Sequence, residues 1–157
     1  MTHVPTLDEV MTKSPHTIGE DIKLSEAIHR MREYHIHHLP VLNAGVLVGI
    51  LSDRDVKLAL SVHPEATDLK VADVMTEVAY AVPPETPLDE ATAQMAKHKY
   101  GCTVVQNSSG KTIGIFTAND AVRVLTNVMR GIRRKEQIPL KNSLRAINPS
   151  MNWRATG

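Results

Sequence analysis

The chain has 157 residues, of which 42% are hydrophobic and 3% aromatic, and its formal charge is +1. That length holds one ordinary domain or two small ones, with a core built mainly from aliphatic side chains. The scarcity of aromatic residues argues against a protein that stacks the bases of single-stranded nucleic acid. One cysteine excludes a disulfide framework or a Cys-rich zinc site, and no apolar run approaches the roughly 20 residues of a membrane span.

The charge is distributed unevenly along the chain. Residues 129–157 contain seven basic residues and one acidic residue, a net +6, whereas the rest, with 11 basic and 16 acidic residues, carries −5. This basic tail is either a solvated terminus or an arm that docks on a partner subunit or a phosphate-bearing ligand. No helix-turn-helix or zinc pattern supports nucleic-acid binding. Because we find no signal segment and a lone cysteine suits a reducing compartment, we expect a cytoplasmic protein without a membrane partner.

The first part of the chain has the element order β-α-β-β-α after a short helical turn. Apolar residues at helical spacing, such as Leu24 and Met31, predict an amphipathic helix, and two apolar runs separated by a turn sequence predict a hairpin. In chain order we expect a turn ending at Met11, an extended piece at 15–18, this helix, strands at 39–42 and 46–51, and a helix that begins at Ser52.

The second part of the chain repeats the first at an offset of 64 and then 65 residues. The matches include Met11-Thr12 with Met75-Thr76, Leu24 with Leu88, Gly49-Ile50 with Gly114-Ile115, Ser52 with Thr117, and Asp55 with Asp120. After a linker at 61–70 we expect a turn ending at Met75, an extended piece at 78–82, a helix through Met95, strands at 103–106 and 112–116, and a helix that runs from Thr117 to Gly131.

This periodicity predicts an α/β (α+β) protein of two tandem β-α-β-β-α units, residues 1–64 and 65–128, followed by the tail at 129–157. A unit of about 60 residues makes a marginal core alone, so we expect the two units to pack together with approximate two-fold symmetry. A cleft between them is a common place for a ligand. The methionines at matching positions are interpreted as core or interface packing.

The Ser/Thr-x-x-Asp motif stands where a strand leads into a helix, once in each unit. The first N–H groups of a helix have no internal partner and favour an anion. An ionised aspartate only accepts hydrogen bonds, which suits the hydroxyls of a ribose. The motif therefore fits a nucleoside with its phosphates directed to one side. It is also close to a capping box, which needs no ligand.

The repeated unit resembles the CBS domain. The resemblance covers roughly residues 6–128, and its order and spacing occur twice. The residues that carry it are 8–12, 24–27, 38–41 and 49–55 in the first copy, and 72–76, 88–91 and 114–120 in the second. It implies a tandem pair, a Bateman module, that is not an enzyme. Such a module binds AMP, ADP, ATP or S-adenosylmethionine as a regulatory ligand, and it usually forms a homodimer. The regulated effector protein is not identifiable from the sequence.

The same resemblance implies the binding residues. Asp55 and Asp120 hold the ribose hydroxyls, and Ser52 and Thr117 lie near the phosphates. The other residues expected at the ligand are His16, Thr17, His38, Leu39, Pro40, Arg54, Tyr80 and Cys102. Asn119 replaces Arg54 and Val104 replaces Pro40 in the second copy, which predicts two unlike sites.

Other chemistry is weakly supported. The histidine cluster at 29–38 fits no standard zinc spacing, so we expect no metal site. Cys102 lacks a recognisable base and is interpreted as a buried thiol, and no catalytic residues are identified. The competing hypothesis is a non-catalytic interaction or oligomerisation module with degenerate clefts, acting through its basic tail.

Overall fold

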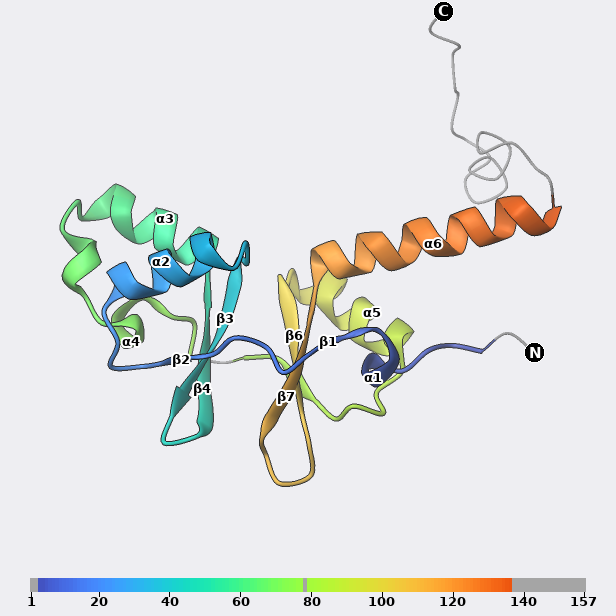
Figure 1. Cartoon of the computed structure of the whole chain (residues 1–157), viewed down its shortest axis with the longest axis horizontal. Helices are drawn as coiled ribbons and strands as arrows, with labels where there is room; N and C mark the ends of the chain where they lie inside the picture. The colour runs from blue at the N-terminus through green and yellow to red at the C-terminus, as the bar shows by residue number, and fades with distance from the viewer. Residues whose placement is uncertain (1–2, 78, 137–157) are drawn as a thin grey trace, which may run out of the picture. The chain divides into compact units, whose positions relative to one another are not determined.

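The computed structural model describes residues 3–77 and 79–136 of the chain (Figure 1). The predicted fold class is confirmed: helices alternate with the strands of two small sheets. In the first repeat the elements are α1 (Leu7–Val10), β1 (Thr12–Lys13), β2 (Ile18–Gly19), α2 (Leu24–Glu33), β3 (His38–Asn43), β4 (Val46–Ser52) and α3 (Asp53–Val62). After a 3-10 turn, η1 (Ala66–Asp68), the second repeat has α4 (Val71–Val74), β5 (Ala81–Val82), α5 (Leu88–His98), β6 (Cys102–Gln106), β7 (Thr112–Thr117) and α6 (Ala118–Glu136).

The contacts divide the chain into two compact units, one ending at Ala118 and the other beginning at Asn119. The first unit therefore contains both sheets and the second contains α6 almost entirely. The sequence divisions at residues 64 and 128 stay predictions about the repeat.

Each repeat contributes one antiparallel hairpin to a sheet. The order is β2-β3-β4 in the first sheet and β1-β7-β6-β5 in the second. The strand bounds agree with the sequence-based expectation to within about one residue at most ends. Register places His38 beside Ser52 in the first hairpin and Cys102 beside Thr117 in the second.

The repeats exchange their entry segments, which the sequence did not predict. β1 pairs with β7 of the second repeat, Thr12 lying opposite Ile115, and the matching Thr76 bridges to Ile50 of the first repeat. The helical turns are exchanged as well, because the Leu7 N–H donates to the Thr86 carbonyl at 3.0 Å and residues 71 and 22 repeat this bond at 2.8 Å. The two copies are thus interlocked by symmetric backbone hydrogen bonds.

This exchange explains why Met-Thr and Gly-Ile recur in the sequence. Met75 lies against Gly49, where a Cβ would come within 2.8 Å of its sulfur and within 2.6 Å of the Thr76 carbonyl oxygen. Met11 lies against Gly114 in the same way. Glycine leaves the space that the crossing segment occupies.

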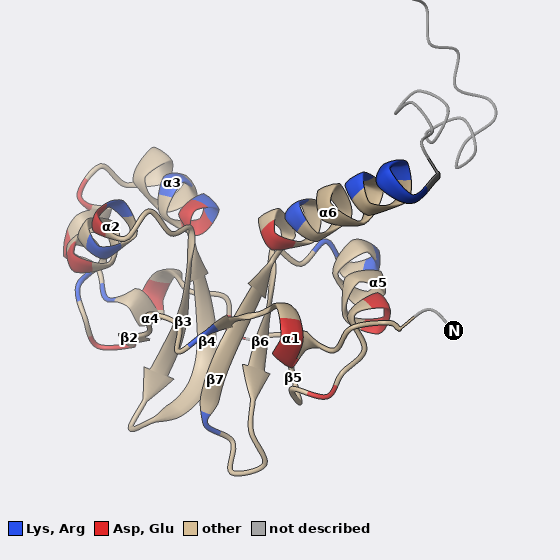
Figure 2. Cartoon of the chain, turned by 45° about the vertical axis from the view of Figure 1, so that its right-hand side comes forward, with Lys and Arg blue, Asp and Glu red and all other residues tan. Residues whose placement is uncertain are grey.

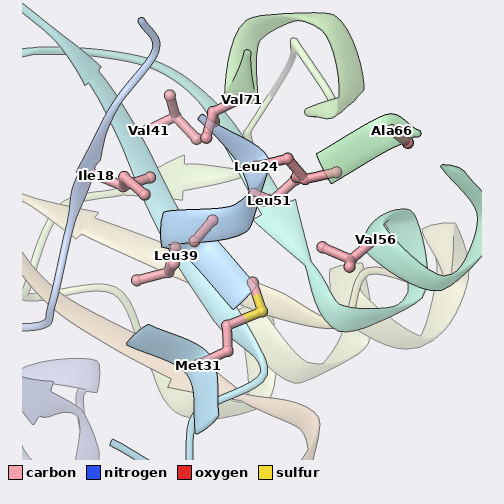
Figure 3. Packing of buried hydrophobic residues seen from close by; sticks show 10 residues of the cluster. Ile18, Leu24, Met31, Leu39, Val41, Leu51, Val56, Ala66 and Val71 are labelled. Carbon is pink, nitrogen blue, oxygen red and sulfur yellow. The ribbon is translucent and has the colours of Figure 1, made fainter. Parts of the chain in front are cut away.

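The core of the first sheet lies under α2 and α3 (Figure 3). Leu24 and Met31, expected from helical spacing to face inward, are buried there together with Val56 of α3. Val71 of α4 also belongs to this cluster, although it comes from the second repeat. The apolar core is therefore shared between the repeats.

The helix α6 is 19 residues long. Its last turn contains basic residues, which Figure 2 colours blue. The expectation that Gly131 stops it was wrong. A glycine inside a helix costs only about 1 kcal/mol relative to alanine. The Arg133, Arg134 and Lys135 side chains that follow are good helix formers and interact favourably with the helix dipole at its C-terminal end. The rest of the predicted tail, 137–157, lies outside the described residues.

Candidate functional site

The junction between β4 and α3 is held by a reciprocal cap. Ser52 Oγ accepts a hydrogen bond from the Asp55 N–H at 3.1 Å, and Asp55 Oδ2 accepts one from the Ser52 N–H at 2.9 Å. The capping interpretation of the motif is therefore realised in the first repeat. It leaves a ligand-binding role open, since Asp55 is half-buried and no donor in the described part of the chain reaches its Oδ1.

The start of α3 offers fewer available N–H groups to an anion than the sequence suggested. The Asp53 N–H donates to the His37 carbonyl at 2.8 Å, and the Asp55 N–H is held by the cap. Among the described residues, this leaves the Arg54 N–H without an acceptor in the first turn. The Arg54 side chain is exposed, so an anion here would meet one amide and one guanidinium.

His38 joins this junction from β3. It is half-buried beside Ser52, and burial is the main cause that lowers the pKa of its imidazole, followed by the charge of His37 and opposed by the carboxylate of Asp55. Its Nε2 faces Gly101 of the second repeat, where a Cβ would lie 2.6 Å away. Sequence reasoning missed Gly101, whose signal was that it replaces His37 at the matching position.

The matching junction of the second repeat is different. Cys102 is buried beside Thr117, and burial raises the pKa of its thiol to about 12, which does not suit a nucleophile. Asp120 is 8% exposed, and its Oδ1 is bound by the guanidinium of Arg123 one turn along α6. That carboxylate already has a cationic partner within its own helix.

Two more of the predicted residues, His16 and Tyr80, occupy matching positions in the two repeats, but the hydrogen bonding of their backbone carbonyls differs. The Tyr80 carbonyl accepts a hydrogen bond from the Val104 N–H at 2.8 Å. The equivalent donor in the first repeat would be Pro40, which has no N–H. Among the described residues, nothing donates to the His16 carbonyl. Ala81, the first residue of β5, corresponds to Thr17 at the offset of 64 residues. β2 begins at Ile18 and thus starts one residue later in its repeat than β5 does.

The side chains of the remaining predicted residues have different surroundings. Leu39 and Pro40 are fully buried, so their side chains do not line a surface. His16 is exposed and stacks on Tyr34 with ring centroids 3.9 Å apart, and Tyr80 stacks on Tyr100 at 5.2 Å. The Thr17 carbonyl accepts a hydrogen bond from Arg30. The structure thus brings Ser52, Asp55 and His38 together, with Arg54 in the same turn.

The described part of the chain also contains a hollow beside this junction. A cavity of about 490 Å³ lies between α2 and α3. Its lining consists of Ile28, Met31, Arg32, His35, Ile36, His37, Asp53, Val56, Lys57 and Leu60, none of which was predicted as a site residue. Within the described ranges, no three His, Cys, Asp or Glu side chains form a metal-binding group, and no helix has the length and apolar character needed to cross a membrane.

Comparison with known proteins matches the CBS domain family twice, at residues 7–62 and 71–127. An inosine-5′-monophosphate dehydrogenase of Korarchaeum cryptofilum is 38% identical over 104 residues, 66% of this chain but 21% of the enzyme. The chain thus spans about a fifth of that enzyme. A CBS domain-containing protein of Dictyostelium discoideum is 30% identical over 135 residues, which are 79% of this chain and 93% of the relative.

Solved structures share the fold. AcuB from Vibrio cholerae has a TM-score of 0.73 at 30% identity, covering 87% of this chain and all of that one. CBSX2, solved in complex with AMP, has a TM-score of 0.68 at 25% identity and covers 78% of this chain and 97% of its own. The CBS domain pair of MJ0100 has a TM-score of 0.73 at 24% identity over 80% of this chain and 98% of that one.

Proposed function

Since the chain belongs to the CBS domain family, we propose that it is a cytoplasmic regulatory module that binds an adenine nucleotide at the β4–α3 junction of its first repeat. The observation that carries the proposal is the half-buried Asp55, whose Oδ2 is fixed by the cap while its Oδ1 has no donor among the described residues. The related CBSX2, solved in complex with AMP, supports adenine nucleotides as the ligand class.

The chemistry of the junction fits a nucleotide part by part. Asp55 Oδ1, which no donor in the described ranges reaches, is an acceptor for ribose hydroxyls, and it is held in place because the cap fixes the carboxylate. The Arg54 N–H and guanidinium suit a phosphate, and the nearby start of α3 adds the positive end of a helix dipole. The His16 carbonyl, to which no described residue donates, is an acceptor for an amino group such as the one on C6 of adenine.

In the second repeat, each corresponding group either has a bonding partner within the chain or is replaced by another residue type. Arg123 binds the carboxylate of Asp120, Val104 donates to the Tyr80 carbonyl, and Asn119 replaces the cation Arg54. A ligand that must displace such bonds gains less binding free energy than a ligand whose binding groups meet no competing bond. We therefore assign nucleotide binding to the first repeat alone.

A module of this kind acts through an assembly, and exposed apolar side chains support a homodimer. On α3, Leu58 and Val62 are 65% and 63% exposed. On α6, exposed apolar residues recur at helical spacing, namely Val122, Leu125, Val128 and Ile132. Apolar stripes of this length on surface helices mark contact with another chain. A second copy of the chain supplies the same stripes.

Isothermal titration calorimetry of the full chain with AMP, ADP, ATP and S-adenosylmethionine tests the proposal. We expect heat from at least one of these ligands, a stoichiometry of one per chain, and weaker binding of inosine monophosphate, whose 6-oxo group cannot donate to the His16 carbonyl. Folded protein that gives no heat with any adenine ligand would favour the competing interaction module.

A further inference from the structure

The C-terminal part of α6 extends beyond the repeat that the family shares. The match to the CBS domain family ends at residue 127, whereas α6 continues to Glu136. Gly131, where the sequence predicted a stop, lies inside the helix, so the basic residues on either side of it belong to one regular element. Their directions around the helix axis are therefore fixed relative to one another.

The exposed arginines of this extension gather on one side of the helix, which we call the basic face: Arg130, Arg133 and Arg134. At about 100° per residue, the three fall within an arc of about 100°. Val128 and Ile132, members of the apolar stripe assigned to the homodimer, each lie about 160° away from Arg130. The basic face, coloured blue in Figure 2, therefore stays open when a second copy covers the apolar stripe.

The basic face has no acidic partner in the described part of the chain. Residues 121–135 contain no aspartate or glutamate, and the one ion pair found for α6 joins Arg123 to Asp120 near its beginning. Arg130 lies one turn from both Arg133 and Arg134, and like charges at that spacing repel each other. An anion that lies along the basic face would relieve this repulsion.

The charge of the rest of the chain directs an anion to this end. Residues 1–128 carry −5, whereas residues 129–157 carry +6. The part of the sequence outside the described residues continues the trend, since 137–157 contains three basic residues and no acidic one. A large anion is thus repelled by the repeats and attracted by the extension.

The residue type and the spacing favour a polymer of phosphates. A guanidinium binds phosphate through two parallel hydrogen bonds, which the point charge of a lysine does not provide. Four residues of a helix rise about 6 Å, so Arg130 and Arg134 meet separate charges of an extended ligand. Double-stranded DNA carries one negative charge per roughly 1.7 Å of its axis, dense enough to supply each arginine.

We propose that the basic face of α6 binds the phosphate backbone of duplex DNA without reading the base sequence. A helix with its side chains is about 10–12 Å wide, which the major groove of B-form DNA, about 12 Å wide, can admit. The major groove of A-form RNA is too narrow for it. The lack of a recognition motif in the sequence agrees with contacts to phosphates, which position a protein but do not specify bases.

Two other polyanions fit this surface less well. An interfacial helix buries its apolar face in the membrane. In α6 that face lies opposite the arginines and is assigned to a second copy of the chain. Single-stranded nucleic acid is bound by stacking on aromatic side chains, which make up 3% of this sequence. No residue of the basic face belongs to the proposed nucleotide site, so this inference does not depend on AMP binding.

Fluorescence anisotropy of the full chain with a labelled DNA duplex of mixed sequence tests the proposal. The triple variant Arg130→Gln, Arg133→Gln and Arg134→Gln keeps good helix formers and removes three charges. We expect its affinity in about 50 mM salt to fall at least tenfold. The slope of log affinity against log salt should become shallower by about 2.7, which is 0.9 for each lost phosphate contact.

A matched control removes three exposed lysines that lie outside α6, through Lys97→Gln, Lys99→Gln and Lys111→Gln. It changes the net charge by the same amount, and we expect it to keep the wild-type affinity and salt slope. Equal losses in the two triple variants would show that DNA responds to the overall charge of the protein, and would overturn the assignment to the basic face.

A pair of variants that preserves the charge tests whether the helix is needed. Gly131→Pro interrupts the helix between Arg130 and Arg133, and should weaken DNA binding by about tenfold, the value of a charge-assisted hydrogen bond. Gly131→Ala adds a Cβ that meets no atom within 4 Å outside the helix backbone, and should bind at least as tightly as wild type because alanine favours the helix. Equal affinity of both variants would contradict binding by a helical face.

Competition against the labelled duplex identifies the kind of anion. The competitors are unlabelled DNA duplex, RNA duplex of the same sequence, polyglutamate and vesicles that contain phosphatidylserine, compared at equal concentration of negative charge. We expect the DNA duplex to displace the probe at the lowest concentration. Displacement at the same or a lower concentration by RNA, polyglutamate or vesicles would assign the basic face to that partner and overturn the proposal.

Discussion

The two strand-to-helix junctions share one repeated sequence motif, but the aspartate of that motif has different partners in each. In the first, Asp55 keeps an oxygen without a donor among the described residues, and Arg54 stands beside it. In the second, Asp120 is held by Arg123, which occupies the position of Leu58. Of the two residues at this matching position, only Arg123 gives the carboxylate of its motif a cationic partner. A motif match alone does not say whether its polar groups remain available to a ligand.

The largest effect should come from the glycines that the exchanged segments cross. Gly49→Ala brings a Cβ within 2.6 Å of a backbone oxygen, that of Thr76, whereas at Gly114 the obstacle is the flexible Met11 side chain. We expect Gly49→Ala to lower the free energy of unfolding by about 1–3 kcal/mol, as overpacking does, and Gly114→Ala by less. Urea denaturation measures both, and equal losses would contradict the asymmetry.

A smaller effect is expected at the cation that only the first junction has. Arg54→Ala should weaken AMP binding about tenfold, the value of one charge-assisted hydrogen bond, and leave adenosine binding nearly unchanged. Calorimetry with both ligands measures the difference. The reciprocal Asn119→Arg should change neither affinity, and an equal loss for adenosine in Arg54→Ala would show that the side chain does not contact the phosphate.

Pro40, which has no N–H to donate to the His16 carbonyl, offers a subtler test. Pro40→Ala restores an N–H in β3, and we expect it to engage that carbonyl as Val104 engages Tyr80. AMP affinity should then fall about fivefold, close to one neutral hydrogen bond, and the preference for AMP over inosine monophosphate should shrink. Val104→Pro serves as the matched control in the second repeat. A preference that survives Pro40→Ala would argue against the carbonyl.

The smallest effect concerns pH. Burial lowers the pKa of His38, so below about pH 6.5 the unfolded chain takes up a proton more readily than the folded one. Stability should therefore fall as the pH drops from 7 to 5. In His38→Gln this loss should be reduced, while the exposed His63→Gln should behave as wild type. Thermal unfolding at several pH values measures it, and parallel curves for all three proteins would contradict the assignment.

The sequence was informative where the structure is local and repeated. Apolar spacing located α2 and α5, and the Ser52 cap was recognisable from its motif. The pairing of β1 with β7 was missed because two residues carry no strand pattern of their own and are stabilised by Ile115 and its neighbour, about a hundred residues away. The continuation of α6 beyond Gly131 and the cavity between α2 and α3 were missed as well. Both depend on many small contributions to the folding free energy, and no sequence motif marks either of them.

The sequence identified the motif that marks the candidate site, but not which of its polar groups already have a partner in the folded chain. The sequence identified Asp55 and Asp120 as equals, since pattern matching cannot show that Arg123 reaches one of them. It also placed Leu39 and Pro40 at a ligand surface, although their side chains are buried. The difference between repeats depends on side-chain direction and on a missing N–H, which only the three-dimensional arrangement displays.

The most direct test of the central claim is AMP calorimetry on the matched pair Asp55→Asn and Asp120→Asn. Asparagine keeps an acceptor for the Ser52 N–H, so the cap can persist while the negative charge is lost. We predict that Asp55→Asn weakens AMP binding by about tenfold or more, the value of hydrogen bonds to a charged group, and that Asp120→Asn leaves affinity and stoichiometry unchanged. Loss of binding in Asp120→Asn with retention in Asp55→Asn would contradict the account.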